Sequence, residues 1–295
     1  MSSFRSRAVD GVVLSRWQSE GMGARVRRSI GGAQLPNVGG VFLLLDEFNA
    51  GLPAAFPDHA HRGMATVSFL LPWSEGGFQH EDSKGHKGKL EAGDLQFMVA
   101  GRGIAHSEVP MDERAAHGVQ LWVNLKRKDK MMEPSYQDLK WGDIAKASKD
   151  GVDVAVISGS SLGVKSPVYT PQPVEYLFVN MAPGTTFEQP INPGWVAFAY
   201  VLKGSADFSG TAVGSHNTVT FKDQPEASGV RVEAQKEAVT FILLSGEPID
   251  EPVVQHGPFV MNTREEIMQA FADYRYGRNG FEGAPQWESE IAKKL

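Results

Sequence analysis

Short runs of apolar residues recur along the chain, and turn signals separate them. In residues 118–125 the apolar positions alternate with more polar neighbours, which is the period of a strand with one buried face. Similar runs occupy residues 40–48, 65–71 and 94–100, with glycine-rich or polar turns at 74–77, 82–86 and 91–94. Strands this short and this closely spaced predict a sandwich or barrel rather than a parallel sheet with crossover helices.

The second half of the chain repeats this pattern. We predict that residues 126–149 form a linker with one short helix. Strand-like runs then resume at 152–159, 174–181, 195–204, 217–221 and 239–246. The glycine and mixed apolar strand at 62–71 are echoed at 193–202, as expected of an internal repeat. We therefore predict two copies of one β-barrel, the first in residues 1–140 and the second in residues 141–295.

One amphipathic helix is predicted near the end of the chain. Thr263 in the sequence TREE is a good N-cap, and Glu266 completes a capping box at the third helical position. The apolar residues that follow at helical spacing on one face are Ile267, Ala270, Phe271 and Tyr274. Gly277 is expected to end the helix. We expect this helix to pack on the barrels as a structural element.

The amino-acid composition argues against several classes of function. The 295 residues carry a formal net charge of −6 without a large block of one sign, which argues against binding nucleic acid through a broad basic face. Cysteine is absent, so disulfides, thiolate metal sites and cysteine nucleophiles are excluded. No apolar stretch is long enough to span a membrane, and the N-terminus lacks the apolar core of a signal peptide. We therefore expect a monomer in the cytoplasm and/or nucleus that is not secreted.

Two pairs of metal-binding residue types stand at strand spacing. In FPDHAHRG the pair is His59 and His61, and residues two apart on a strand point to the same face, about 6–7 Å apart. In AGRGIAHSE the pair is His106 and Glu108, preceded by two glycines that would allow a sharp turn. On neighbouring strands of a barrel, these pairs would bring three imidazoles and one carboxylate to a common point.

That donor set suits a divalent first-row metal. Neutral imidazole favours iron, copper, nickel or zinc, and a carboxylate without thiolates shifts the preference towards iron or manganese. Four protein ligands leave one or two octahedral positions open, which is typical of a catalytic site. The matching segments of the second half, 188–195 and 228–235, contain no histidine, so only the first barrel is expected to bind metal.

Other polar residues near these pairs have plainer interpretations. Asp58 and Arg62 flank the first pair and are candidates to orient the ligands by hydrogen bonds. His80 and His86 flank a turn, and we expect both to be exposed. The small basic cluster at residues 24–29 is either a surface for a partner or an ordinary solvated strand edge.

Together these stretches resemble the pirin family of bicupins. The resemblance runs from about residue 24 to about residue 280, through FPDHAHRG, GDLQFMVAGRGIAHSE, HGVQLWVNL, EPSYQ, DGVDVAVISG and EPVVQHGPFVMNT. It implies an all-β-dominated fold of two cupin (jelly-roll type) β-barrels packed face to face, with a C-terminal helix. It also implies that the first barrel holds Fe(II) and that the second holds no metal.

The resemblance also implies which residues act. The positions that match the family's metal ligands are His59, His61, His106 and Glu108. Pirins usually carry Glu where this chain has Ala65. We expect this departure to leave the metal in place and to alter the polarity of the pocket.

Two functions follow from the resemblance. One is a quercetin 2,3-dioxygenase, which opens a flavonol ring with O2, with Glu108 either remaining a ligand or detaching to act as the base. The other is an iron-dependent, redox-sensitive transcriptional co-regulator that binds a protein partner such as a transcription factor. A metal-dependent isomerase or storage protein on the same fold stays open as well, because fold does not fix function.

Overall fold

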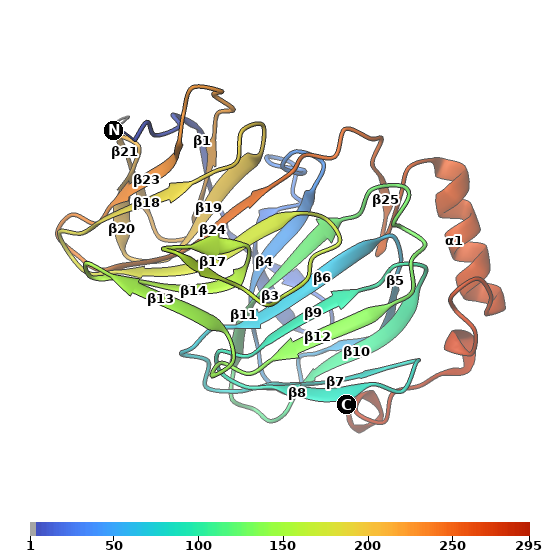
Figure 1. The fold of residues 1–295 in the computed structure, drawn as a ribbon. Helices are drawn as coiled ribbons and strands as arrows, with labels where there is room; N and C mark the ends of the chain where they lie inside the picture. Colours follow the sequence, from blue (N-terminus) through green and yellow to red (C-terminus); the bar gives the residue numbers. More distant parts are fainter. Residues whose placement is uncertain (1–3) are drawn as a thin grey trace. The chain divides into compact units, whose positions relative to one another are not determined.

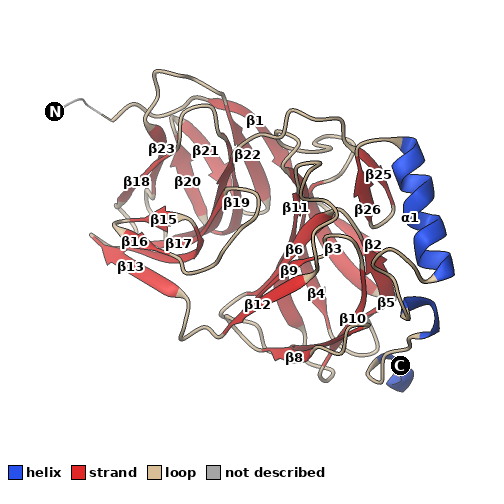
Figure 2. Cartoon of the chain, turned by 45° about the vertical axis from the view of Figure 1, so that its right-hand side comes forward, coloured by secondary structure: helices blue, strands red, loops and turns tan. Residues whose placement is uncertain are grey.

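The computed structural model describes residues 4–295, most of which lie in strands or the turns between them (Figure 2). Strand accounts for 51% of the chain and helix for 6%, which confirms the predicted fold class. The chain forms two compact units, and each is assembled from separated segments. The unit named here the histidine unit contains Trp17–Gly31, Phe42–Gly142 and Ile249–Leu295. The second unit contains Met1–Arg16, Gly32–Val41 and Asp143–Pro248.

The histidine unit contains a seven-stranded sheet, a four-stranded sheet and a C-terminal extension (Figure 1). The larger sheet, of order β12-β9-β6-β11-β4-β3-β2, consists of β2 (Trp17–Glu20), β3 (Ala24–Ile30), β4 (Phe42–Ala50), β6 (Met64–Leu70), β9 (Leu95–Val99), β11 (Ala116–Asn124) and β12 (Ser135–Leu139). The smaller sheet, of order β5-β10-β7-β8, consists of β5 (Phe56–His61), β7 (Phe78–Asp82), β8 (Lys87–Leu90) and β10 (Ile104–Pro110). The extension consists of β25 (Val254–His256), β26 (Phe259–Met261), α1 (Arg264–Tyr276), η1 (Ala284–Gln286) and η2 (Ala292–Lys294).

The second unit has the same two kinds of sheet. Its seven-stranded sheet, of order β1-β22-β19-β24-β17-β14-β13, consists of β1 (Val9–Leu14), β13 (Ala145–Lys149), β14 (Val152–Ser158), β17 (Val174–Met181), β19 (Val196–Lys203), β22 (Asn217–Phe221) and β24 (Val239–Gly246). Its four-stranded sheet, of order β18-β23-β20-β21, consists of β18 (Thr186–Pro190), β20 (Ser205–Phe208), β21 (Thr211–Gly214) and β23 (Gly229–Glu233). A small ribbon pairs β15 (Ser160–Ser161) with β16 (Val164–Lys165).

The two units repeat one topology, strand for strand. Reading both smaller sheets from one edge, β5, β10, β7 and β8 correspond to β18, β23, β20 and β21. In the larger sheets β6 and β11 correspond to β19 and β24, and the edge strand β12 corresponds to β1. The internal repeat in the sequence therefore reflects a duplicated barrel.

The expected division was a single cut at residue 140. In the observed units the two ends of the chain are exchanged: the N-terminal segment belongs to the second unit, and the C-terminal segment belongs to the histidine unit. The N-terminal strand β1 pairs with β22 and completes the larger sheet of the second unit, whereas α1 belongs to the histidine unit. The prediction of a short helix within residues 126–149 was wrong. That segment contains β12 and β13 instead, because each strand supplies an edge for a different sheet.

The interior of the second unit is apolar. Its buried core includes the inward residues of β18 and β23 and the phenylalanines around them: Phe187, Val230, Val232, Phe208 and Phe241. These are the two strands that correspond to β5 and β10, which carry the histidines in the other unit. Apolar side chains therefore fill the part of the second barrel that matches the candidate metal centre.

The C-terminal helix begins and ends as the sequence predicts. The Thr263 side chain accepts a hydrogen bond from the backbone of Glu266, and the Glu266 side chain accepts one from the Thr263 backbone. Gly277 closes the helix with a φ of 61°, a left-handed conformation that favours glycine. Ile267 and Ala270 are buried, while Phe271 remains 37% exposed. None of the described helices is long and apolar enough to cross a membrane.

Candidate metal centre

The histidines are brought together by pairing between β5 and β10. The antiparallel register places His106 opposite His59 and Ile104 opposite His61. Because side chains alternate across a strand, His59 and His61 share one face of the small sheet with His106. The strand register shifts between His106 and Glu108, and Glu108 pairs with Phe56. Glu108 therefore does not continue the regular pairing that aligns the histidines.

Two glycines allow the chain to turn sharply around these strands. Gly63 follows β5 with a φ of 83°, and a Cβ atom there would lie 1.9 Å from the Val260 carbonyl oxygen. Gly103 precedes β10 with a φ of 145°, and its missing side chain leaves room for the Phe281 ring. Both positions therefore require glycine, for backbone conformation and for space.

The three histidines form a compact cluster of possible ligand atoms. Their ring nitrogens lie within 4.8 Å of one another, and the Nε2 atoms of His59 and His106 are 2.9 Å apart. His59 Nδ1 lies 2.8 Å from the Pro57 carbonyl oxygen, which fixes this ring so that Nε2 faces the cluster. Two imidazole nitrogens bound about 2.1 Å from one ion in neighbouring octahedral positions would lie about 3 Å apart, so this spacing fits a shared metal ion.

Burial keeps two of these rings neutral and leaves them without good partners. His61 and His106 are each 1% exposed. Burial lowers the pKa of both imidazoles well below the ordinary value, and positive charge on His59 would lower each pKa further. Among residues 4–295, no group makes a well-formed hydrogen bond to either ring nitrogen of His61 or to Nδ1 of His106. Buried polar atoms normally have a hydrogen-bond partner. A divalent metal ion would bind these unpartnered nitrogens, so the three histidines fit the metal that the sequence led us to expect.

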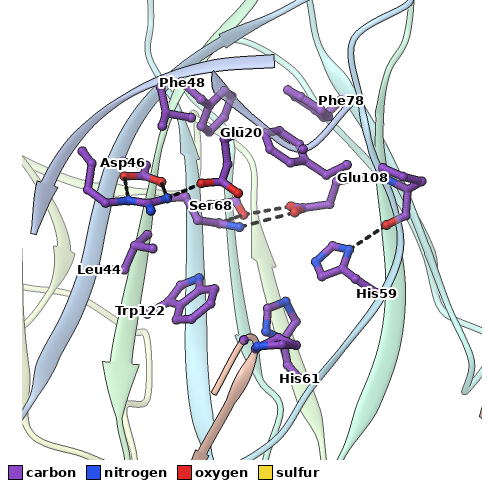
Figure 3. A pocket seen from close by; sticks show the side chains of 18 of the residues that line it. Glu20, Leu44, Asp46, Phe48, His59, His61, Ser68, Phe78, Glu108 and Trp122 are labelled. Atoms are coloured by element: carbon purple, nitrogen blue, oxygen red, sulfur yellow. Dashed lines mark hydrogen bonds and ion pairs between the residues drawn. The ribbon is translucent and has the colours of Figure 1, made fainter. Parts of the chain in front are cut away.

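Glu108 lies in the same cavity but outside the histidine cluster. It is 8% exposed, and its carboxylate accepts hydrogen bonds from Ser68 Oγ at 3.1 Å and Gln120 Nε2 at 3.3 Å. Figure 3 shows the Glu108 carboxylate turned towards Ser68, with His59 and His61 nearby in the same pocket. The structure therefore brings the three predicted histidines together and places the predicted carboxylate beside them, held by two donors.

A cavity of about 540 Å³ opens from the histidines between the two sheets of the unit. One wall is apolar and largely aromatic, formed by Val26, Phe48, Phe56, Leu70, Phe78 and Leu90. The Trp122 ring lies edge-on to His61, with 5.4 Å between ring centroids. A cavity of this size with few polar groups is typical of small-molecule sites.

The far wall of the cavity is polar and internally paired. Arg28 donates from Nε and from a terminal nitrogen to the two carboxylate oxygens of Asp46, at 3.0 and 2.7 Å, and to Glu20 at 2.6 Å. The hydrogen bond to Asp46 raises the pKa of Arg28, whereas burial raises the pKa of Asp46. This paired group could not be predicted from the sequence, because charged residues in a strand are ordinarily assigned to the solvent face.

The basic cluster at residues 24–29 is divided by strand alternation. Arg28 faces the cavity, while Arg25 and Arg27 lie over the ring of Trp17, at 5.5 and 4.4 Å from its centroid. Arg27 also lies 3.8 Å from the buried carboxylate of Glu47. These arginines therefore have partners within the same sheet.

Two expectations about neighbouring polar residues were wrong. His80 is buried, at 4% exposure, because β7 pairs with β10 and places His80 opposite Glu108; its Nε2 lies 2.9 Å from the Gln96 amide nitrogen. His86 is exposed as expected. Asp58 and Arg62 make no hydrogen bond to the histidines within the described residues, and they bind instead to the C-terminal extension and the β9–β10 turn.

The expectation that Ala65 alters pocket polarity was also wrong. Ala65 pairs with Val123 of β11, whereas Ser68 pairs with Gln120, and these last two residues line the cavity. Ala65 is an odd number of residues from Ser68 along a regular strand, so its side chain lies on the opposite face of the sheet. The Ala65 side chain is therefore not part of the cavity lining.

Comparison with known proteins identifies both halves of the chain. A family profile described as Pirin matches residues 23–123, and one described as Pirin C-terminal cupin domain matches residues 176–280. The chain is 52% identical to Pirin of Rattus norvegicus, covering 98% of this chain and 99% of that protein. It is 48% identical to a Pirin-like protein of Solanum lycopersicum, with 97% of each chain covered.

Solved structures share the fold. Quercetin 2,3-dioxygenase from Acinetobacter baumannii superposes with a TM-score of 0.82 at 27% sequence identity, over 95% of this chain and 99% of that one. The bacterial pirin YhhW from Escherichia coli, solved in complex with nickel(II), superposes with a TM-score of 0.66 at 17% identity, over 81% of this chain and all of that one. At this low sequence identity, the similarity to YhhW supports only the shared fold.

Proposed function

Since the chain belongs to the pirin family, we propose that it holds Fe(II) and opens the ring of a flavonol with O2. The proposed ligands are His59, His61, His106 and Glu108. The observation that carries the proposal is the convergence of three histidines, two of which, His59 and His61, line a largely apolar cavity of about 540 Å³. The structural similarity to a protein described as quercetin 2,3-dioxygenase supports the same reaction class.

The donor set is compatible with iron and disfavours a structural zinc site. Three imidazoles and one carboxylate suit iron, and the absence of thiolates disfavours a structural zinc site. When bound, Fe(II) would supply a Lewis acid that increases the acidity of a flavonol hydroxyl and an electron source for reaction with O2. Neutral His61 and His106 are already in the protonation state that metal binding requires.

The protein's own residues would bind and orient the flavonol. The apolar wall of Phe48, Phe56 and Phe78 offers ring faces and edges to a planar aromatic molecule, and it excludes water from the reacting end. Trp122 would cover the opposite side beside His61. Glu108, which accepts hydrogen bonds from Ser68 and Gln120, would either remain a ligand or accept the proton of a hydroxyl that enters between the histidines and the aromatic wall.

Charge along the cavity would select among substrates. Its lining includes four acidic residues, Glu20, Asp46, Asp58 and Glu108, and the guanidinium of Arg28. Arg28 already donates to Asp46 and Glu20, so it offers little to an incoming anion. Phenolic hydroxyls can donate hydrogen bonds to these carboxylate oxygens. A neutral, hydroxyl-bearing aromatic molecule therefore fits better than a small dicarboxylate.

The test is turnover of quercetin by the iron-loaded protein. Protein loaded with Fe(II) without oxygen is mixed with quercetin and air, and loss of the flavonol absorbance is followed together with O2 uptake. We expect turnover well above that of free Fe(II), and its loss in His106→Ala. His256→Ala removes an exposed histidine of the same unit and should retain activity. Turnover no faster than free iron would contradict the proposal.

The co-regulator hypothesis stays a prediction. Its candidate surface was the basic cluster at residues 24–29, and within that cluster Arg28 faces the cavity. Capture of a partner by the Fe(II) form but not by the Fe(III) form would support this second function, whereas equal capture by both forms would remove the proposed switch.

A further inference from the structure

Strand β5 has two faces with different neighbours. His59 and His61 face the cavity, so the alternating residues Ala60 and Arg62 face outward. Asp58 lies at the cavity edge, and its carboxylate reaches Ser289 outside the cavity. Residues 258–291, named here the C-terminal strap, lie against this outer face. Figure 1 shows α1 of the strap running beside β5, and Figure 2 shows the same arrangement from another side. The metal-binding face and the strap-binding face therefore belong to the same short strand.

Arg62 joins the end of β5 to the strap through a buried ion pair. Its guanidinium lies 2.8 Å from Asp273 of α1, and both side chains are at most 2% exposed. Arg62 also donates to the carbonyl oxygens of Arg102 at 2.6 Å and Asn279 at 2.7 Å. Its guanidinium carbon lies 4.7 Å from the centroid of the Phe281 ring. These contacts fix the residue that directly follows His61.

Asp273 is itself held by several strap residues. It accepts hydrogen bonds from the side chains of Gln269, Arg278 and Asn279, at 2.7, 3.1 and 3.0 Å. A buried carboxylate with this many donors has little freedom to move. The position of Arg62 is therefore set by the helix and not by β5 alone.

A second contact holds the strand just before His59. The carboxylate of Asp58 accepts hydrogen bonds from Ser289 Oγ at 2.6 Å and from the Ser289 backbone nitrogen at 3.1 Å. Ser289 is 1% exposed. The next strap residue, Glu290, donates its backbone N–H to Glu81 of β7 at 2.7 Å. The strap therefore contacts β5 on both sides of the histidine pair.

Small residues between these contacts let the strap approach closely. Ala60 and Ala105 face each other across β5 and β10, and both are buried in one apolar cluster with strap residues. The strap members of that cluster are Phe259, Met261, Ile267, Ala270, Phe281 and Ala284. Packing of this kind resists displacement of the sheet relative to the helix.

The second unit shows the same strand without these features. Its corresponding strand β18 carries no histidine, and its outward residue Glu188 pairs with Arg231 of the neighbouring β23, with both side chains partly exposed. No helix occurs in residues 4–16, 32–41 and 143–248, the described part of that unit. Strap and histidines therefore occur on the same copy of the duplicated barrel.

We propose that the C-terminal strap positions the metal ligands: Asp58 and Arg62, fixed by Ser289 and Asp273, hold β5 so that His59 and His61 meet His106. This inference depends on the proposed metal site. Asp58, Arg62, Ser289 and Asp273 are positioning residues that act through the backbone of β5. Loss of an outer contact typically weakens metal binding by about 10- to 100-fold, so loosening the strap should lower metal affinity without removing any ligand.

The experiment measures Co(II) binding by the full chain. Co(II) serves as the probe because its visible absorption reports ligand geometry, and affinity is obtained by competition with a chelator. Ser289→Ala and Asp273→Asn are expected to weaken Co(II) binding about tenfold or more and to change the visible spectrum. Ser289→Thr, which keeps the hydroxyl, should restore both properties.

Arg127→Gln is the matched control. Arg127 pairs with Glu266 at 2.9 Å, near the start of α1, so this variant weakens a strap contact that does not involve β5. Its Co(II) affinity and spectrum should match the unaltered protein. Variants Ser289→Ala and Asp273→Asn that bind Co(II) as tightly as the unaltered protein, with the same spectrum, would overturn the positioning role alone. Ser289→Ala decides the question if Asp273→Asn does not fold. Failure of the unaltered protein to bind Co(II) would overturn the proposed metal site, and the positioning role with it.

Discussion

Lys130 carries its ammonium group inside the histidine unit, where pH should change its contribution to stability. It is 1% exposed, and its Nζ donates to the Gly63 carbonyl oxygen at 2.9 Å, the Asn124 side chain at 2.6 Å and the Val260 carbonyl oxygen at 3.1 Å. These bonds connect the turn after β5 to β26. Burial lowers the pKa of Lys130 from 10.5 to about 8, although Glu251 and Glu266 partly oppose this shift.

The direction of the pH effect follows from proton binding. Below about pH 8 the lysine is charged in both the folded and the unfolded chain. Between about pH 8 and pH 10.5 the folded protein has lost the proton and the unfolded chain still holds it. The unfolded state then binds more protons, so the free energy of unfolding rises with pH. Because each pH unit is worth about 1.4 kcal/mol, the rise should be on the order of 3 kcal/mol.

Lys130→Met tests this reasoning, because it removes the titrating group and keeps a long side chain. The free energy of unfolding of metal-free protein is measured by urea denaturation from pH 7.5 to pH 10. The unaltered protein should gain stability relative to Lys130→Met as the pH rises. Lys128→Met, an exposed change in the same loop, should follow the unaltered protein. Parallel pH curves for the unaltered protein and Lys130→Met would refute the lowered pKa.

Three further predictions concern the metal, the cavity and the helix. A divalent metal at 100 times its dissociation constant should stabilise the protein by about 2.7 kcal/mol and raise its melting temperature, whereas His106→Ala should show no such rise in calorimetry. Leu44→Trp would place an indole in the cavity that Leu44 lines; it should weaken quercetin binding at least about tenfold with metal content unchanged, and unchanged affinity in a fluorescence titration would argue against this binding site. Thr263→Ala removes the side-chain acceptor of the capping box and should lower the free energy of unfolding by about 1 kcal/mol, while Thr263→Ser should restore it in urea denaturation.

The sequence predicted the strands and the histidine cluster well, for a local reason. Alternation with a period of two places residues i and i+2 on one face, so His59 and His61 could be assigned to a common site before any pairing was known. The addition of His106 needed only that two nearby strands be neighbours. The capping box of Thr263 and Glu266 is equally local, and it also appears as predicted.

Features that depend on distant pairing could not be predicted in this way. Nothing within β1 indicates that it pairs with β22, about 200 residues away, or that the C-terminal helix belongs to the unit of the histidines. Arg28 and Asp46 form the polar wall of the cavity because β3 and β4 are neighbours. A charged residue in a strand is predicted to face solvent unless the oppositely charged residue that pairs with it is already known.

The proposed function depends on a divalent metal held by His59, His61 and His106 in the histidine unit. The most direct test is metal analysis of purified protein after loading with Fe(II) and removal of free iron. We expect one iron per chain in the unaltered protein and almost none in His59→Ala or His106→Ala, with full occupancy in His256→Ala. Equal iron content in the unaltered protein and both cluster variants, or none in any of them, would contradict this expectation.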